Sequence, residues 1–229
     1  MKNIMSVIIA AAGSGMRMGG VSKPFLALGR GTILSYSLRT FASLPETAEI
    51  IVVVNRRDLD AAAKSLARMR KRWKISHIVE GGKIRQESVA NGLAHVAPDA
   101  DLIAVHDAAR PFASAGLVRR VIAAALKHGA AIPAIPVKDT LKRAGKDGRV
   151  LETVSRDGLW RVQTPQIFKA QLLRDAYRKF APRGEFTDDA LLVERMGRPV
   201  FIVESDYTNL KITTPGDMPL ARAIAWSRQ

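Results

Sequence analysis

The sequence contains no cysteine, few aromatic residues and no long apolar run. Without cysteine the chain cannot form a disulfide framework, a thiolate metal site or a cysteine nucleophile, and the cytoplasm is the expected location. No apolar run approaches the ~20 residues that a membrane-spanning helix requires, so no membrane partner is expected. Aromatic residues make up 6% of the chain and do not interleave with basic residues, which excludes a platform for stacking nucleobases.

Acidic residues are also scarce. The chain has 36 lysines and arginines against 21 aspartates and glutamates, a formal net charge of +15, which predicts an anionic partner. Much of the excess positive charge lies in the helix-like segment KSLARMRKRWK (64–74), and such a segment most commonly forms a basic helix face exposed to solvent. We therefore expect a small substrate of concentrated negative charge. A basic nucleic-acid-binding protein on a nucleotide-binding fold is the alternative from a different class of function.

The organisation of the chain indicates one domain over residues 1–229, with no linker or internal repeat. The first residues, MKNIMSVIIAAAGSG, share a lysine and a short apolar run with signal peptides, but the glycine-rich loop that follows favours a first strand. Apolar β-branched runs alternate with amphipathic segments, which is typical of a mostly parallel sheet flanked by helices. Strands are expected at 6–11, 49–55, 76–82, 101–107, 130–137 and 199–205, and helices at 32–44, 58–73, 85–96 and 114–129.

Residues 137–160 depart from this alternation. Two polar–apolar alternating stretches flank GKDG, a pattern that predicts a β-hairpin with a glycine turn. A hairpin with so many polar residues cannot form a core of its own. We therefore expect it to project from the sheet and either pack on another subunit or cover the substrate. A solvated excursion is the alternative.

The glycine-rich loop after the first strand, AAAGSGMRMGGVSKPF, is a candidate phosphate cradle. It lacks the third glycine and the later acid of the dinucleotide-binding fingerprint, and valine stands where a Walker A loop needs lysine. What remains is a loop whose backbone amides face anionic oxygens while Arg17 and Lys23 add positive charge. Two cations suit a triphosphate on which charge builds as a bond breaks. A glycine-rich turn with two solvated cations is the alternative.

Further candidates stand just after apolar runs, where an open parallel sheet binds its ligands. Asp107 at a strand end suits Mg²⁺, and Arg110 suits a phosphate, although an internal Asp–Arg pair is also compatible. Glycines 81 and 82 and Ser88 would let a flat base approach the backbone, and Lys211 follows the last strand. Thr187 is expected to begin a helix. His106 has no partner for a catalytic triad and is interpreted as structural.

Seven motifs in order, AAAGSGMRMG…SKPF, HDAARPF, PVKDT, VSRDGLW, TPQIF, FTDDA and NLKITTP, resemble the cytidylyltransferases of the non-mevalonate isoprenoid pathway, which act on 2-C-methyl-D-erythritol 4-phosphate. The resemblance spans nearly the whole chain. It implies a Rossmann-like, nucleotide-diphospho-sugar transferase-like α/β fold with a protruding β-arm, a homodimer made by exchanging arms over 137–160, and Mg²⁺-dependent reaction with CTP.

The resemblance also implies roles for individual residues. Three cations would stabilise the triphosphate as pyrophosphate leaves: Arg17, Lys23 and Lys211. The nucleotide would lie against Ala11, Ala12, Gly13, Ser14, Gly15, Gly81, Gly82 and Ser88, with Asp107 organising phosphates and metal. The methylerythritol phosphate would be held by Arg110, Thr140, Arg156, Thr164 and Thr187, with Arg156 acting in the partner subunit's site.

Two departures from the family pattern concern the nucleotide site. The chain reads KPF where the family usually has lysine, glutamine and an aromatic residue, and Lys83 stands where an acid is common. The cytosine pocket is therefore expected to depend mainly on backbone groups. The nearest alternative is the same chemistry on ribitol 5-phosphate, against which VSRDGLW argues; a regulatory CTP sensor without turnover is disfavoured by the three cations.

Overall fold

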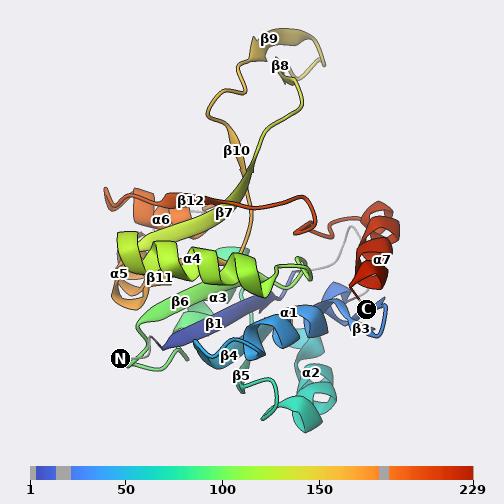
Figure 1. Cartoon of the computed structure of the whole chain (residues 1–229), viewed down its shortest axis with the longest axis vertical. Helices are drawn as coiled ribbons and strands as arrows, with labels where there is room; N and C mark the ends of the chain where they lie inside the picture. The colour runs from blue at the N-terminus through green and yellow to red at the C-terminus, as the bar shows by residue number, and fades with distance from the viewer. Residues whose placement is uncertain (1–3, 14–21, 181–185, 229) are drawn as a thin grey trace.

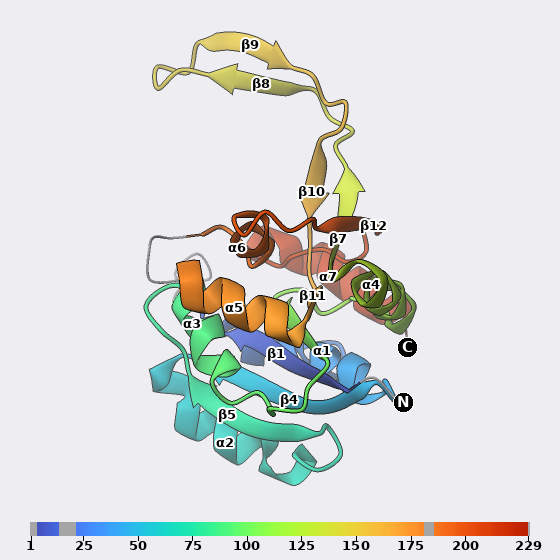
Figure 2. The same cartoon turned by 90° about the vertical axis from the view of Figure 1, so that its left-hand side faces the viewer.

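The chain forms an open sheet with helices on both faces, from which a long arm projects (Figures 1 and 2). The computed structural model describes residues 4–13, 22–180 and 186–228. The strands of the main sheet are β1 (Met5–Ala11), β4 (Thr47–Val54), β5 (Ile75–Glu80), β6 (Leu102–Asp107), β7 (Ala130–Pro136), β10 (Trp160–Val162), β11 (Gln166–Lys169) and β12 (Phe201–Glu204). The helices are α1 (Ile33–Ala42), α2 (Leu59–Leu66), α3 (Arg85–Leu93), α4 (Ala115–His128), α5 (Ala170–Phe180), α6 (Ala190–Glu194) and α7 (Met218–Ser227).

The sheet is mostly parallel, as the sequence predicts. Its strand order is β10-β7-β11-β6-β1-β4-β5, and β12 pairs with β7. Strands β6, β1, β4 and β5 run parallel, whereas β11 and β10 are antiparallel to their neighbours. The carboxyl ends of β1, β4, β5 and β6 therefore meet at one edge, which is where an α/β sheet of this kind binds ligands.

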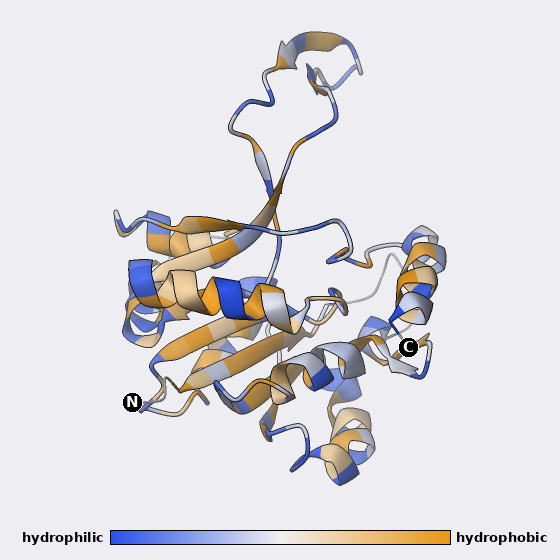
Figure 3. Ribbon diagram, viewed as in Figure 1, coloured by the Kyte–Doolittle hydropathy of each residue, from blue (hydrophilic) through white to orange (hydrophobic). Residues whose placement is uncertain are grey.

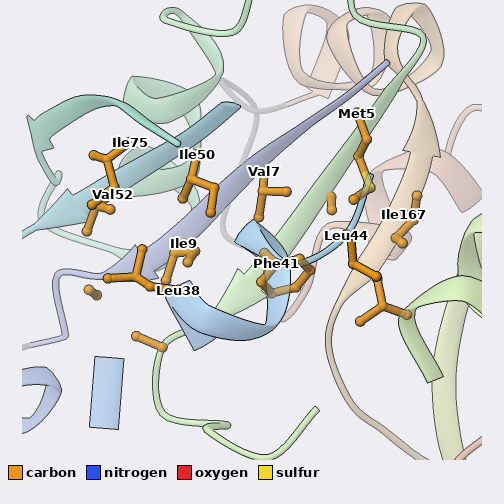
Figure 4. Close-up of a cluster of buried hydrophobic side chains, with 14 of the residues drawn as sticks. Met5, Val7, Ile9, Leu38, Phe41, Leu44, Ile50, Val52, Ile75 and Ile167 are labelled. Carbon is orange, nitrogen blue, oxygen red and sulfur yellow. The ribbon is translucent and has the colours of Figure 1, made fainter. Parts of the chain in front are cut away.

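The two faces of β1 belong to two different cores because successive side chains of a strand point to opposite sides. Val7 and Ile9 pack with residues of α1, α2 and α4, and Figure 4 shows Leu38 and Phe41 of α1 against them. Ile8 packs on the other side with residues of α3, α5 and α6. Burial on both faces explains why β1 and β4 read as continuous apolar runs, which Figure 3 shows in orange.

Two helices differ from the expectation. The segment expected as a helix over 58–73 is α-helical only to Leu66 and continues as the short 3-10 turn η4 (Ala67–Met69). The helix expected to begin at Thr187 begins at Ala190. Its first amides are satisfied differently: those of Asp189 and Ala190 donate to Gln166 Oε1, so no threonine cap is needed.

The expected β-hairpin is confirmed. Strands β8 (Leu141–Ala144) and β9 (Val150–Val154) pair antiparallel at the tip of the arm, far from the sheet (Figure 2). The tip turn is closed by a hydrogen bond from Gly145 N to Arg149 O, and Gly148 has a φ of +82°, which favours glycine. The arm leaves the sheet through β7 and returns through β10, so it projects from one side of the fold.

A small third core joins α7, near the C-terminus, to the segment 26–36. Helix α7 packs on the short hairpin of β2 (Ala27–Leu28) and β3 (Gly31–Thr32), and Phe112 and Ile212 complete the cluster. Between Ser22 and β2, the 3-10 turn η2 (Lys23–Phe25) carries a candidate cation. Within the described ranges, no helix combines the length and the apolar character that crossing a bilayer demands.

Candidate active site

A cavity of about 500 Å³ opens at the carboxyl ends of β1, β4, β5 and β6. Each strand contributes the residues that directly follow its buried run, as an open parallel sheet predicts. Several sequence candidates line it together, namely Ala11, Ala12, Gly13, Lys23, Gly82, Ser88, Asp107 and Lys211. Arg17, Ser14 and Gly15 lie outside the described residues.

Asp107 is the electrostatic centre of this cavity. Its Oδ1 accepts from Arg85 Nε at 3.0 Å, and its Oδ2 lies 2.6 Å from Lys211 Nζ. Burial of the carboxyl raises its pKa, but the two cations outweigh burial and hold the pKa of Asp107 well below its usual value. Asp107 is therefore a carboxylate at neutral pH, and the internal Asp–Arg pair considered from the sequence forms with Arg85 rather than Arg110.

Arg85, which the sequence reading missed, links Asp107 to a second buried acid. Its Nη2 lies 2.8 Å from Asp189 Oδ2, and the Asp189 side chain is only 1% exposed. Tyr177 donates its hydroxyl to Asp189 Oδ1 at 2.5 Å, which together with burial raises the pKa of Tyr177. Helices α3, α5 and α6 thus fix the guanidinium that orients Asp107. The sequence did offer a signal for Arg85, because this cation stands at the first residue of a predicted helix, just after the Gly81–Lys83 loop.

The two described candidate cations converge on the cavity from distant parts of the chain. Lys23 Nζ donates to the Ile212 carbonyl at 3.1 Å, and Ile212 is the neighbour of Lys211. The backbone of Ile212 in turn donates to the carbonyl of Ala109, just beyond β6. These hydrogen bonds hold Lys23 and Lys211 at the same cavity as Asp107, as the sequence reading predicts for one triphosphate site.

The glycines after β5 are required by close packing. A Cβ on Gly81 would lie 2.3 Å from the Cβ of Ala12, and a Cβ on Gly82 would lie 2.2 Å from the Cβ of Glu87. The Gly82 amide donates to Ser88 Oγ at 3.1 Å. Lys83 does not pair through its side chain with an acid, but its amide donates to Glu87 Oε2. The backbone of the loop is therefore held in place by α3, and that backbone lines the cavity.

The residues expected to hold the second substrate are placed separately. Arg110 donates to the carbonyls of Asn209 and Val162, while its buried Nε has no hydrogen-bond partner among the described residues. Thr164 is buried, and its hydroxyl accepts from the Asp107 amide. Thr187 is exposed before α6. Thr140 and Arg156 are exposed on the arm, where Arg156 donates to the carbonyl of Lys138, and they do not line the cavity.

The interpretation of His106 as structural agrees with its surroundings. The ring is fully buried beneath the site, contacts the Thr164 hydroxyl and lies 3.0 Å from the Arg110 carbonyl. Burial lowers the pKa of His106 to about 4, so the ring is neutral at physiological pH. It orients residues around Asp107 without facing the cavity.

The described residues fit a metal ion only in a limited way. They contain no group of three or more histidine, cysteine, aspartate or glutamate side chains that could hold one. Among the residues that the structure describes, Asp107 is the one carboxylate that lines the cavity, and both its oxygens are engaged by cations. Mg²⁺ is commonly bound through one carboxylate and the phosphates of a substrate. The described residues allow this mode of binding but do not supply several protein ligands for the ion.

An open α/β sheet with lysines gathered around one strand-end cavity is the arrangement in which proteins of this class bind phosphorylated ligands. The family model described as 2-C-methyl-D-erythritol 4-phosphate cytidylyltransferase matches residues 5–227. The chain belongs to this family.

Individual relatives agree with the family model. The protein of that name from Pelotomaculum thermopropionicum is 42% identical over 227 residues, which cover 98% of this chain and 95% of the relative. The crystal structure of the Thermus thermophilus protein of that name has a TM-score of 0.80 at 38% identity, with 97% and 99% of the two chains covered. The 4-diphosphocytidyl-2C-methyl-D-erythritol synthase of Anaerococcus prevotii has a TM-score of 0.84 at 34% identity, with 100% and 97% covered.

Proposed function

We propose that the chain transfers the cytidylyl group of CTP to 2-C-methyl-D-erythritol 4-phosphate and releases pyrophosphate, in the synthesis of isoprenoid precursors. The family match supports the reaction and both substrates. The observation that carries the assignment of the site is the convergence of Lys23 and Lys211 on one cavity with Asp107. A cavity lined by several cations and a single, doubly paired carboxylate suits a triphosphate.

In this reaction the phosphate monoester oxygen of the acceptor attacks the α-phosphorus of CTP, and the bond to the β-phosphate breaks. A phosphate monoester is already ionised near neutral pH, because its second pKa is about 6. No general base is therefore required, and Asp107, the carboxylate that lines the cavity among the described residues, is already engaged by two cations. Catalysis reduces to positioning and to stabilising charge on the departing pyrophosphate.

The chain's residues divide this work. Lys23, Lys211 and, from the family resemblance, Arg17 neutralise the phosphates, and backbone groups of 11–15 and 81–82 hold the nucleotide. Asp107 keeps the Lys211 ammonium in position through their 2.6 Å contact, and Arg85 keeps Asp107 in position. Mg²⁺, arriving with the triphosphate, would be held by its phosphates and by Asp107 and would supply further charge neutralisation.

The arm is the second part of the proposal. Val150 and Leu151 of β9 are 57% and 54% exposed, and the isolated β8–β9 hairpin is too small to be stable without partners. We infer that a second copy of the chain covers the arm. Arg156, which lies on the arm away from its own cavity, would then complete the partner's acceptor site, to which the family resemblance also assigns Arg110, Thr140, Thr164 and Thr187.

The nucleotide reaction is tested by pyrophosphate release with CTP, Mg²⁺ and methylerythritol phosphate, with ATP, GTP and UTP as controls. Lys211→Met should lower kcat by about a hundredfold or more, the effect of removing one group that stabilises transition-state charge. Lys127→Met, on the exposed side of α4, is the matched control and should keep full activity. Normal turnover of the Lys211 variant would refute its role, and faster turnover with ribitol 5-phosphate would reassign the acceptor.

Sharing of the site between subunits is tested by complementation. Variants Lys211→Met and Arg156→Gln should each be inactive, because each lacks one part of every site. After mixing and exchange of subunits, one site of each mixed dimer is complete, so about a quarter of wild-type activity should return. If Arg156 acts in its own subunit, mixing restores nothing.

A further inference from the structure

A second cavity, of about 660 Å³, lies on the far side of η2 from the nucleotide site. Its walls come from η2, the β2–β3 turn, α1 and the end of the basic segment, by which we mean residues 59–74. The volume is within the range of small-molecule sites in proteins. Nothing in the proposed reaction uses this cavity.

The cavity is strongly cationic. Arg30, Arg39 and Arg72 line it, and no aspartate or glutamate does. Within the described part of the chain, none of these arginines forms an ion pair, and Arg30 and Arg72 make no side-chain hydrogen bond. The basic segment itself has six lysines and arginines and one aspartate, so nearby charge does not compensate. Arginines without counterions around one hollow favour an anion there.

Arg39 is held in position before any ligand arrives. Its Nη2 donates to Ser35 Oγ at 3.2 Å, and its guanidinium lies 5.1 Å from the centre of the Tyr36 ring. Gly31 makes this position possible, because a Cβ there would lie 2.3 Å from Arg39 Nη2. The Arg39 guanidinium therefore occupies the space in which the Cβ of any residue other than glycine at position 31 would lie.

Beside the arginines and the hydroxyl residues Thr32, Ser35 and Ser65, the cavity has an apolar wall. Trp73 and Phe25 are half-buried, and both pack on the core that lies beneath α1 and α2. Leu66 and Met69 complete this wall. A simple inorganic anion would leave these side chains without a partner, whereas a phosphorylated molecule with an aromatic or apolar part would contact both halves of the cavity.

The geometry points to a binding site for a small organic phosphate, with its phosphate on Arg30, Arg39 and Arg72 and its apolar part on Trp73 and Phe25. The site is also connected to the first cavity. Phe25 lines the second cavity, and Lys23 and Pro24 of the same 3-10 turn line the first. A ligand that packs on Phe25 therefore changes the position of Lys23 and hence the affinity for CTP; this coupling, unlike the binding itself, rests on the proposed function.

Benzyl phosphate is a suitable probe, with benzyl alcohol and inorganic phosphate as its two halves. Trp73 reports binding by fluorescence once Trp160 and Trp226, which lie outside the cavity, are replaced by phenylalanine. Benzyl phosphate should give a saturable change, and each half should bind at least about tenfold more weakly. Calorimetry on the unaltered protein gives the same comparison without the two replacements.

The variant Arg30→Gln/Arg72→Gln should weaken benzyl phosphate by about tenfold or more, since each arginine provides a charged hydrogen bond. Its control, Arg68→Gln/Arg119→Gln, removes two exposed arginines that do not line the cavity and should bind normally. Absence of saturable binding, equal binding of benzyl alcohol, or equal losses in the two variants would overturn the site.

Coupling is measured as the dissociation constant of CTP with and without saturating benzyl phosphate. We expect a change of about fivefold or more that disappears in Arg30→Gln/Arg72→Gln. An unchanged constant would overturn the coupling, and a change that persists in this variant would show competition at the first cavity instead. Failure of pyrophosphate release with intact benzyl phosphate binding would refute the proposed function alone.

Discussion

Arg85 should contribute more to stability than a surface arginine because it neutralises two acids at once. Arg85→Gln would leave Asp189, whose side chain is 1% exposed, with Tyr177 as its main partner, and would leave Asp107 with Lys211 alone. Removing one partner of a buried ion pair typically costs 3–5 kcal/mol. Since the Arg85 side chain is 26% exposed and Asp107 keeps one cation, we expect the lower end, about 3 kcal/mol.

This loss can be measured as a change in melting temperature. For a chain of this size, 1 kcal/mol corresponds to about 2–4 °C, so Arg85→Gln should lower Tm by about 6–12 °C at pH 7. Arg178→Gln is the matched control: its pair with Asp175 has side chains 74% and 37% exposed. An exposed pair contributes at most about 1 kcal/mol, so the control should lose no more than about 4 °C.

The pH dependence gives an independent check. The pKa of Asp107 is depressed in the folded protein, so its contribution to stability is complete above the ordinary carboxyl pKa and declines as pH falls below it. Without Arg85 the pKa of Asp107 rises, and the folded variant takes up this proton at a higher pH. The difference in unfolding free energy between wild type and Arg85→Gln should therefore be largest at pH 7 and narrow toward pH 4. A Tm loss no greater than that of Arg178→Gln, or a constant difference across this range, would refute the reasoning.

Three further outcomes follow from the site. His106, with its pKa lowered to about 4, should show no ring titration by NMR between pH 8 and 5, and a midpoint near 6.5 would contradict its burial. Because the unfolded ring takes up its proton below about pH 6.5, this residue alone should lower stability by about 3 kcal/mol between that pH and 4, measurable by urea unfolding. Gly81→Ala, with its Cβ 2.3 Å from that of Ala12, should cost about 1–3 kcal/mol and weaken CTP binding, and unchanged unfolding would show that the loop yields freely. Lys211→Met should lower Tm by no more than about 4 °C, because the Lys211 side chain is 41% exposed; a larger loss would make its kinetic effect structural.

Every strand expected from the sequence is present, including the largely exposed β12, but the predicted bounds are closest for strands that are buried on both faces. β1 and β6 were expected within a residue of their observed bounds, because continuous apolar runs leave little freedom in placing a strand. β11 has only four residues, too few for a period to show. Helix α5 did carry a signal, since its buried Leu173, Ala176 and Tyr177 have helical spacing, and it was nevertheless missed.

The site divides in the same way. Lys23, Asp107 and Lys211 could be found because each follows an apolar run or a glycine loop, and strand ends meet at one edge. Arg85 carried a signal and was missed, but its pairing with Asp189 could not be predicted, because the acid follows no apolar run and reaches Arg85 only through the packing of α3 against α5 and α6. The predicted start of α6 at Thr187 was wrong for a similar reason, because Gln166, which is distant in sequence, accepts the hydrogen bonds of the amides at the start of the helix.

The location of the positive charge connects the two cavities. In the first, Asp107 is held between Arg85 and Lys211, and Lys23 and Lys83 add further positive charge to the lining. In the second, the lining arginines have no acid at all. Positive charge thus lines cavities on both sides of η2, a turn of three residues. Because coupling between two binding sites is reciprocal, an organic phosphate that tightens CTP binding from the second cavity should itself bind more tightly in the presence of CTP.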